Sequence, residues 1–486
     1  MSPGVEPQLE DPKLMAPQRE ALLAALREAC GGDLAAVKVD GESLDEASKD
    51  WSFHTPHRPL AVACPSSPEQ TAAVVRACVA ARVPMVPRGG GTGVEGGAIP
   101  YGGGVVVSTE RLRRLELRSD ELLAVVGAGV YKEELGKFLK PHGLLFGPDP
   151  SSNPTLGGMA STGGSGMTTM RYGTTKENVV SLVVVTAQGE VIQTRRPVRK
   201  SSSGYELTQL YMGAEGTLGI ICELTVRLRK QPPLRSGGVL PFSNVKDAVD
   251  TVVGAVHIDP PSMLRCELLN SEGVECTNKI FKTTLRECPM LFLEFQGADA
   301  ALLRQDFDKV VAIAAQHGCV ASEVQYAEHG ESLDEIWEAR RGCYVAAMRY
   351  RGQGRDRVFV SDVCVPIPRL AECVAGAEAD CQALGLKCVI CAHIADGNFH
   401  CLVPHQPAEM EAVNEFEAKI ISRALACGGT VSGEHGIGVG KVAHSCREHG
   451  EAHVAVQQSI KRALDPLGLM NPGKVLPLPK DGPAKL

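Results

Sequence analysis

Two hydrophobic periodicities alternate along the first half of the chain, and they predict alternating helices and strands. Residues 67–81 repeat apolar positions at helical spacing, with Ser67 as a suitable N-cap and Pro68 in the first turn. Short apolar runs at 61–64 and 83–87 flank this helix and predict strands. The same patterns predict further strands at 104–108, 122–126, 179–186, 190–193 and 219–228, and further helices at 18–30 and 131–140.

The pattern changes after a stretch rich in proline and glycine at 230–238, which we interpret as a linker. Beyond it, apolar runs predict antiparallel strands and longer periodic segments predict helices, which indicates a second domain of the α+β class. The predicted strands lie at 239–241, 290–296 and 358–366, the helices at 244–255, 300–316 and 407–426, and a hairpin at 386–404.

Charge and composition exclude several classes of partner. The 486 residues include 50 Lys+Arg and 57 Asp+Glu, for a net charge of −7, and no long basic run. We therefore expect no nucleic-acid partner and no anionic membrane surface as a partner. No stretch reaches the ~18 apolar residues that a membrane-spanning helix needs. The 17 cysteines are interpreted mainly as small buried apolar residues in a reducing compartment.

Glycine is enriched, at 52 residues against a usual share of ~7%, and a dense run of it follows the strand at 83–87. Gly91, Gly93 and Gly96 match the dinucleotide fingerprint, but glycines and Pro100 follow where that motif requires a helix, so a Rossmann domain is not predicted. No Gly-Lys-Ser/Thr follows either. Successive glycines can instead turn consecutive N–H groups toward a pyrophosphate. The alternative from the residues alone is a mobile glycine hinge.

A second glycine-rich tract runs from 147 to 173, and a third short turn lies at 213–219. Both are rich in backbone donors and short hydroxyl side chains. Two such tracts flanking one αβ domain suggest a long ligand bound along a cleft.

A histidine pair brackets a predicted tight turn. Asp396 and Gly397 are typical of a two-residue type I′ turn between apolar runs, which places His393 directly opposite His400. Their Cβ atoms would then lie about 4.5–5.5 Å apart, close enough to hold one ion. Glu434, between glycines, offers a third ligand suited to a divalent metal. Two stacked histidines without a metal are the alternative.

Three motifs together resemble the flavin-binding signature of the vanillyl-alcohol-oxidase/PCMH family. They are PRGGGTG at 87–93, LGGM at 156–159 and GAEGTLGI at 213–220. With the C-terminal features, residues 50–478 are similar to the cytochrome-type D-lactate dehydrogenase branch of the FAD-linked 2-hydroxyacid dehydrogenases. The resemblance implies an α+β fold in which a two-subdomain PCMH-type FAD-binding domain precedes a substrate (cap) domain with an antiparallel sheet, and a C-terminal tail returns to the FAD domain.

The resemblance implies FAD, with its pyrophosphate on residues 88–93 and its ring near the 147–173 tract. Thr92 stands where family members with covalent flavin carry a histidine, so the FAD is expected to be non-covalent. The cofactor-binding residues implied are Arg88, Gly89, Gly90, Gly91, Thr92, Gly93, Pro148, Asp149, Ser152, Leu156, Gly157, Gly158, Thr162, Gly166, Arg171, Tyr172, Gly173, Glu215, Gly219, Ile220 and Asn471.

The same resemblance assigns His393, His400 and Glu434 as ligands of one divalent metal (Zn, Mn or Fe) and His435 as the catalytic base. In the mechanism this implies, the metal binds the substrate hydroxyl and a carboxylate oxygen, His435 takes the hydroxyl proton, and hydride passes to flavin N5. The product is a 2-keto acid.

Substrate recognition is expected to rest on Arg340, the arginine of a Trp-x-x-Arg motif that would bind the C1 carboxylate. Polar residues that a D-2-hydroxyglutarate enzyme would use map to Tyr344, Val360 and Leu402. A second carboxylate would lack its lysine there. The pocket wall therefore favours D-lactate or a longer aliphatic D-2-hydroxy acid.

The expected organisation is a leader with one helix at 1–50, the FAD domain at 51–233, the cap domain at 234–450 and a C-terminal segment at 451–486 that packs on the FAD domain. Cytochrome c or a quinone is the expected electron acceptor, and a homodimer is left open. The location would be mitochondrial in a eukaryote, with a targeting peptide absent from this sequence, and cytoplasmic otherwise. Alternatives are a glycolate or D-2-hydroxyglutarate dehydrogenase, a non-redox metallohydrolase and an inactive flavoprotein subunit.

Overall fold

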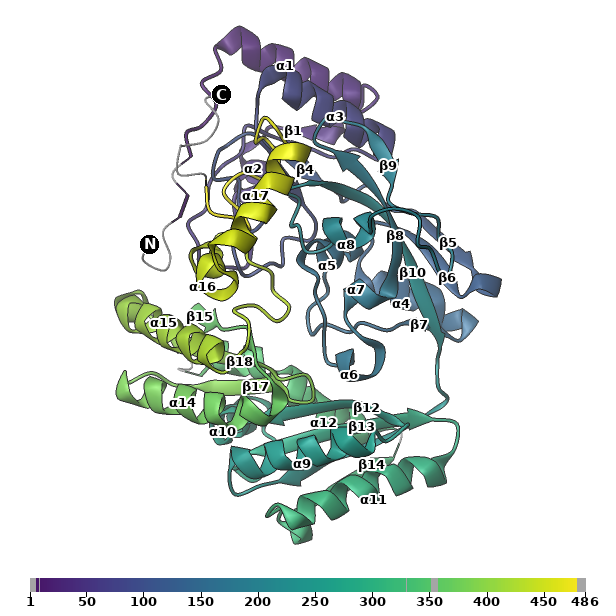
Figure 1. Ribbon diagram of the computed structural model, residues 1–486, viewed down its shortest axis with the longest axis vertical. Coiled ribbons are helices and arrows are strands. Elements are labelled where there is room, and N and C mark those ends of the chain that lie inside the picture. Colours follow the sequence, from purple (N-terminus) through teal and green to yellow (C-terminus); the bar gives the residue numbers. More distant parts are fainter. Residues whose placement is uncertain (1–5, 8, 329, 351–356, 479–486) are drawn as a thin grey trace. The chain divides into compact units, whose positions relative to one another are not determined.

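The computed structural model describes residues 6–7, 9–328, 330–350 and 357–478. The outer ends of the predicted leader and C-terminal segment lie outside these residues. The chain divides into two compact units (Figure 1). The first comprises residues 1–165, 173–230 and 434–486, and the second comprises 166–172 and 231–433. The return to the first unit thus begins at 434, before the position 451 expected from the sequence.

The first unit contains two sheets over one continuous hydrophobic core. The smaller sheet has the order β1-β2-β4-β3 and is parallel except for β1. The larger is antiparallel with the order β5-β6-β10-β8-β9, and β7 pairs with the end of β10. The strands are β1 Val37–Lys38, β2 Ala61–Ala63, β3 Met85–Arg88, β4 Val105–Ser108, β5 Leu115–Arg118, β6 Leu123–Gly127, β7 Leu144–Phe146, β8 Val179–Thr186, β9 Val191–Gln193 and β10 Gly219–Lys230.

Helices cover these sheets and connect their strands. The two longest near the N-terminus, α1 and α3, pack side by side (Figure 1). Ser67 caps α3 as predicted, since its hydroxyl accepts the N–H of Gln70 at 3.2 Å. The helices are α1 Ala16–Ala29, α2 Gly41–Ala47, α3 Pro68–Ala81, α4 Lys132–Leu139, α5 Leu156–Thr162, α7 Thr175–Asn178, α8 Leu207–Tyr211, α16 Ser445–His449 and α17 Glu451–Leu464.

The C-terminal tail returns to the small sheet. Met470 forms a parallel bridge with Met85, and the N–H of Asn471 donates to the Met85 carbonyl at 2.7 Å. Leu469 and Met470 are fully buried in the core of this unit. This return and the α+β class agree with the sequence-based prediction.

The second unit is an eight-stranded antiparallel sheet with the order β14-β11-β13-β12-β17-β18-β15, and β16 pairs with β18. Its strands are β11 Leu234–Pro241, β12 Met263–Leu269, β13 Met290–Gly297, β14 Gln325–Glu328, β15 Arg357–Val360, β16 Val363–Cys364, β17 Val389–His393 and β18 Asn398–His405. Its helices are α6 Thr169–Tyr172, α9 Val245–Ile258, α10 Ser271–Phe281, α11 Ala300–Gln316, α12 Glu331–Arg341, α13 Cys343–Met348, α14 Leu370–Ala383 and α15 Met410–Ala426.

Helices cover both faces of this sheet, and strand alternation shows which face each covers. On β13, Phe292 contacts Trp337 of α12, whereas Phe295, an odd number of residues away, contacts Phe307 of α11. The face of Phe292 is packed by α10, α12 and α13 around one hydrophobic cluster. This face also carries the candidate site.

The predicted linker is wrong over most of its length. Gly237 and Gly238 lie inside β11, paired with both β13 and β14, and of the predicted linker only 231–233 lie outside the strands β10 and β11. A Cβ on Gly237 would lie 2.2 Å from the Leu293 carbonyl oxygen, and one on Gly238 2.0 Å from that of Gln325. Glycine here permits close backbone approach in a central strand, not flexibility.

The predicted strand at 358–366 is interrupted. β15 ends at Val360 and β16 begins at Val363, so Ser361 and Asp362 lie between the two strands. All of the 17 cysteines except Cys319, Cys364 and Cys446 are buried, as interpreted from the sequence. No helix in the described part of the chain is long and apolar enough to cross a membrane.

Candidate functional site

The hairpin that carries the histidine pair has a different register from the predicted one. His393 pairs with Asn398 and His400 pairs with Cys391, so the loop is the four-residue segment 394–397 and not a two-residue turn. The shift is two residues, and a shift of two keeps each side chain on its face of the sheet. The two imidazoles are therefore diagonal neighbours, with ring centroids 5.5 Å apart.

Both imidazoles are held through Nδ1. His393 Nδ1 lies 2.8 Å from a carboxylate oxygen of Glu267, and His400 Nδ1 lies 2.9 Å from the carbonyl oxygen of Ser361. Because both partners are acceptors, Nδ1 of each ring carries the proton and Nε2 keeps its lone pair. Orientation by an acceptor at Nδ1 is the usual arrangement around metal-binding histidines.

Arg340 shares the carboxylate of Glu267. Its Nη2 lies 2.5 Å from the second oxygen of Glu267, and its Nη1 lies 3.5 Å from the Cys343 sulfur. Burial opposes the charge of this guanidinium, but the Glu267 carboxylate outweighs burial and raises the pKa of Arg340. Its Nε is buried and has no hydrogen-bond partner among the described residues.

Glu267 was not identified from the sequence, although a signal exists. It lies in the strand Met263–Leu269, where two charged residues, Arg265 and Glu267, interrupt an apolar run. Both are fully buried. Charged residues in a buried strand are rare unless they are paired, so the run itself indicates buried ion pairs.

A second buried ion pair joins β12 to its neighbour β13. Arg265 donates to Glu294 through Nε at 2.8 Å and Nη2 at 2.5 Å, and Arg235 donates to the other oxygen of Glu294 at 2.5 Å. The Arg265 guanidinium lies over the ring of Trp337, 4.1 Å from its centroid. The tryptophan of the Trp-x-x-Arg motif is therefore a buried support for Arg265.

Asp362 fixes the segment that leads to Glu434. Its carboxylate accepts from the Asn398 amide at 3.0 Å and from the Ser432 hydroxyl at 2.8 Å, and lies 3.8 Å from His400 Nδ1. Its carbonyl oxygen accepts the N–H of Gly433 at 2.8 Å. Asp362 was also missed by sequence reasoning, because it stands in an interruption that was interpreted as continuous strand.

Glu434 and His435 begin the last stretch of the first unit, directly after Gly433 of the second. A carboxylate oxygen of Glu434 accepts the hydroxyl of Ser165 at 2.6 Å, and its other oxygen lies 4.0 Å from His435 Nε2. The polypeptide thus passes from the segment held by Asp362 straight into the predicted ligand and base.

Glu215 holds the loop that follows His435. Its buried carboxylate accepts the N–H of Ile437 at 2.6 Å and that of Gly438 at 3.0 Å. Burial raises the pKa of Glu215 to about 7, although these two donors act in the opposite direction. The structure therefore shows Glu215, predicted as a cofactor residue, as an internal support of the loop at 437–438.

The glycine run after β3 presents unused backbone donors. The five N–H groups of residues 89–93 donate to no acceptor within the described chain. The run lies against the second tract, since a Cβ on Gly89 would be 2.4 Å from the Thr155 hydroxyl oxygen and 3.7 Å from the Gly158 nitrogen. Consecutive free N–H groups fit a pyrophosphate, so these residues fit FAD.

Four of the remaining predicted cofactor residues use their polar side chains in hydrogen bonds within the protein. Arg88 Nη1 donates to the Lys49 carbonyl, and Asp149 accepts from Lys132. Thr162 donates to the Gly158 carbonyl, and the Asn471 amide donates to the carbonyls of Gly97 and Glu215. Leu156 and Ile220 are core residues, and Gly219 begins β10.

The second tract is not one continuous piece of the first unit. Residues 166–172, which include Gly166, Arg171 and Tyr172, belong to the second unit, and the Tyr172 hydroxyl contacts Gln296 of β13. Pro148, Ser152, Gly157 and Gly173 remain in the first unit. Only part of the tract therefore accompanies the glycine run at 89–93.

The three predicted wall residues lie in or against one hydrophobic cluster. Val360 and Leu402 are directly opposite each other on neighbouring strands, and Leu402 is two residues beyond His400, so it shares the face of His400. Leu402 is 2% exposed, and burial raises the pKa of Tyr344. The described surroundings at Val360 and Leu402 are apolar.

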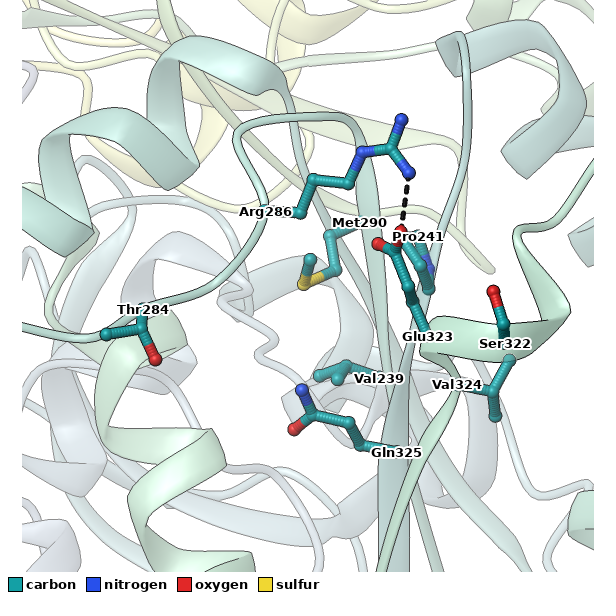
Figure 2. Close-up of a pocket in the computed structure, with 9 residues that line it drawn as sticks. All are labelled: Val239, Pro241, Thr284, Arg286, Met290, Ser322, Glu323, Val324 and Gln325. Atoms are coloured by element: carbon teal, nitrogen blue, oxygen red, sulfur yellow. Dashed lines mark hydrogen bonds and ion pairs between the residues drawn. The ribbon is translucent and has the colours of Figure 1, made fainter.

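A separate cavity of about 350 Å³ lies at the other end of the same sheet. Figure 2 shows Arg286 and Glu323 joined by an ion pair beside Val239, Met290 and Gln325. None of the predicted site residues is among those that line this cavity. It is distinct from the histidine site.

Comparison with known proteins agrees with this architecture. Residues 59–195 match the model of an FAD binding domain, and residues 231–475 match that of the C-terminal domain of FAD linked oxidases. The fold is similar to that of p-cresol methylhydroxylase, with a TM-score of 0.76 and 16% identity over 96% of this chain and 98% of that one.

Curated relatives span almost the whole chain. A probable mitochondrial D-lactate dehydrogenase of Danio rerio is 36% identical over 94% of this chain and 92% of its own length. A mitochondrial D-lactate dehydrogenase [cytochrome] of Arabidopsis thaliana is 36% identical over 88% and 75%. A glycolate oxidase subunit GlcD of Bacillus subtilis is 30% identical over 86% and 89%. The chain therefore belongs to the FAD-linked oxidase family, with a PCMH-type FAD-binding domain followed by the C-terminal domain of that family.

Proposed function

We propose that the protein oxidises D-lactate, or another aliphatic D-2-hydroxy acid, to the 2-keto acid with FAD and one divalent metal ion. The observation that carries the proposal is the pair His393 and His400, whose Nδ1 atoms both lie on acceptors. That arrangement leaves two Nε2 lone pairs on one face of the sheet, which is the donor set of a first-row metal. The matched relatives named as D-lactate dehydrogenases support the substrate class.

Glu434 is proposed as the third ligand. It follows Gly433 directly, and the backbone of Gly433 is hydrogen-bonded to Asp362, which also lies beside His400. Two imidazoles and a carboxylate suit Zn, Mn or Fe(II) with positions left for substrate. When bound, FAD accepts the hydride, and the metal ion lowers the pKa of the substrate hydroxyl.

The chain itself supplies a proton acceptor and an anion site. His435, adjacent to Glu434, takes the hydroxyl proton, since an imidazole is a suitable base at neutral pH. Arg340 binds the substrate carboxylate through donors that Glu267 does not use, and its buried Nε is one of them. The carboxylate thereby fixes the orientation of the α-carbon.

The apolar pair Val360 and Leu402 favours an aliphatic substituent on that carbon. A second carboxylate next to these two apolar side chains would lose its hydration and gain no hydrogen bond or ion pair from them, which costs several kcal/mol. This disfavours D-2-hydroxyglutarate. Glycolate is the second candidate, because the Bacillus subtilis relative is named as a glycolate oxidase subunit.

The FAD is proposed to be non-covalent, since Thr92 replaces the tethering histidine. The electron acceptor is proposed to be a cytochrome c or a quinone; the Arabidopsis thaliana relative is named as a cytochrome-type D-lactate dehydrogenase. A mitochondrial location is proposed for the case of a eukaryotic source.

Anaerobic flavin reduction tests the function directly. D-Lactate should bleach the yellow protein faster than glycolate or D-2-hydroxyglutarate, and L-lactate should leave it oxidised. Metal analysis of the same sample should find about one equivalent per flavin in the wild type and a loss of it in His400→Ala. His435→Ala should retain colour and metal but lose bleaching by at least 100-fold.

Three results would contradict the proposal. Colourless protein would exclude the flavin, and bleaching that persists in His435→Ala would exclude that residue as the base. Faster bleaching by glycolate than by D-lactate would instead support the second candidate.

A further inference from the structure

One buried carboxylate contacts two functional groups at once. Glu267 lies in β12, with one oxygen 2.8 Å from His393 Nδ1 and the other 2.5 Å from Arg340 Nη2. All three side chains are buried, and Glu267 is 0% exposed. Because no solvent reaches this carboxylate, its negative charge interacts mainly with His393 and Arg340.

The strand register explains how the contact to His393 arises. β12 pairs with β17 through Leu268 and Ala392, and through Leu269 and Cys391. Continuing this antiparallel register by one residue sets Glu267 level with His393, and both point to the same face of the sheet. The contact is therefore built into two central strands and does not depend on a loop.

The contact determines which nitrogen of His393 can bind an ion. A carboxylate only accepts hydrogen bonds, so Nδ1 must carry the proton and Nε2 must keep its lone pair. His400 has a neutral carbonyl oxygen at the same position. A charged acceptor increases the basicity of the imidazole more than a neutral one does, so His393 should be the stronger ligand of the pair.

The contact to Arg340 has a second consequence. The guanidinium is neutralised and oriented by Glu267 through Nη2, while its Nε remains without a described partner. An arginine held rigidly by one carboxylate presents its remaining donors in a fixed direction. It is therefore organised for a second, incoming carboxylate before that carboxylate binds.

We propose that Glu267 is a positioning residue that sets both the tautomer of His393 for metal binding and the direction of Arg340 for substrate carboxylate binding. This rests on the proposed function of the site. A single side chain then links the two binding events. Removal of its charge should weaken metal binding and carboxylate binding together.

The variant Glu267→Gln tests this with little change of shape. The glutamine amide offers one acceptor and one donor group, so it cannot accept from both His393 and Arg340. Metal affinity, measured by chelator competition with Zn²⁺ on metal-stripped flavoprotein, should fall by about 10–100-fold. In metal-saturated enzyme, KM for D-lactate should rise about tenfold, with a smaller change in kcat.

Glu294→Gln is the matched control. Glu294 is equally buried on the neighbouring strand and also binds arginines, but those are Arg265 and Arg235. Both variants should lose similar thermal stability, because each leaves a buried guanidinium with a weakened partner. Only Glu267→Gln should lose Zn²⁺ affinity. A general structural effect would reduce the affinity equally in both.

Two further variants, His400→Ala and a double variant at Glu267 and Arg340, distinguish failure of the positioning role from failure of the metal site. If His400→Ala loses Zn²⁺ while Glu267→Gln binds it like the wild type, the positioning role is wrong and the metal site survives. If His400→Ala retains Zn²⁺, the proposed metal site itself is wrong. If Glu267→Gln does not fold, the double variant Glu267→Gln/Arg340→Gln removes both charges together and should show the same loss of Zn²⁺ affinity. Wild-type affinity in that double variant would overturn the inference.

Discussion

Burial selects the protonation state of individual side chains in this protein, and His444 is a clear case. The residue precedes α16, is 3% exposed, and its Nδ1 lies 3.3 Å from Arg447. Burial, together with the charges of Arg447 and Lys441, lowers the pKa of His444 to about 4. The folded protein therefore accepts the neutral imidazole and disfavours the charged one.

This shift predicts a specific loss of stability in acid. Between pH 6.5 and pH 4 the unfolded chain binds a proton at His444 that the folded chain does not bind. The stabilisation is present above pH 6.5 and is lost as the pH falls toward 4. In His444→Gln the free energy of unfolding should therefore fall less steeply as the pH is lowered. Between pH 7 and pH 5 the variant should gain roughly 1–2 kcal/mol relative to the wild type.

Urea unfolding of the two proteins at both pH values measures this difference. The quantity compared is the change in the free energy of unfolding with pH. A constant difference in stability caused by loss of the His444 side chain does not affect it. An identical decline in wild type and variant would contradict a buried neutral His444.

At the scale of elements, the two glycines of β11 show why one prediction from sequence was wrong. Glycine next to proline is typical of a linker, but the same pattern can occur in a strand whose neighbours approach closely. Only the tertiary structure distinguishes the two: the carbonyl oxygens of Leu293 and Gln325 lie where Cβ atoms on Gly237 and Gly238 would be.

Gly237→Ala should consequently destabilise the second unit. Its Cβ would lie 2.2 Å from the Leu293 oxygen and 2.9 Å from a Leu333 methyl group, so the strands must separate. We expect a loss of roughly 1–3 kcal/mol in the free energy of unfolding, measured by urea denaturation.

Gly136→Ala provides the matched control. Gly136 lies within α4, and a Cβ there would meet nothing within 4 Å. Alanine should stabilise that helix by about 0.5–1 kcal/mol. A flexible linker at 237–238 would instead tolerate alanine, with no loss of stability in Gly237→Ala.

Local signals predicted many elements well, because they depend on neighbours in sequence. The cap of Ser67, the long strand at Val179–Thr186 and the helix at Ala300–Gln316 appear as expected. The hairpin was located correctly but paired two residues out of register. Turn chemistry at Asp396 and Gly397 favoured a two-residue loop, whereas the contacts of β12 and β18 set the observed pairing.

At the scale of the whole molecule, the order of segments along the chain determines how the first unit is held together. The first unit is built from three stretches of chain, and the last of these, from Glu434 onward, follows the entire second unit. It is bound to the first stretch through Met470, Asn471 and Lys474, the last donating to the Ile99 carbonyl at 2.7 Å. The first unit is therefore incomplete without the C-terminal residues.

A cut at 231–233, one of the four places where the chain passes between the units, should for this reason leave the fragments together. Cleavage at a protease site introduced at 231–233 yields pieces ending at 230 and beginning near 234, and the second piece carries the final stretch of the first unit. The fragments should co-elute in gel filtration, retain yellow colour, and separate in urea. Separate elution under native conditions would show that the tail contributes little.

The candidate site residues could be named from the sequence where one motif carries them, and not where other strands supply them. His393, His400 and Glu434 stand in short glycine-marked motifs, so they could be named from the sequence. Glu267 and Asp362 belong to segments without a motif and reach the histidines only through sheet pairing and an interrupted strand. Partner residues supplied by other strands depend on registers that the sequence does not specify locally.

The hairpin at His393 and His400 also has a consequence for sequence change. The faces of a strand alternate, so the face on which each ring lies depends on its position within its own strand. β17 is also paired with β12, and β18 with β15, so a residue added to the loop at 394–397 leaves both rings on the face of α12. A single residue inserted between Asn398 and His400 would instead turn His400 toward the face of α11. Length variation is therefore expected in the loop and not in the two strands.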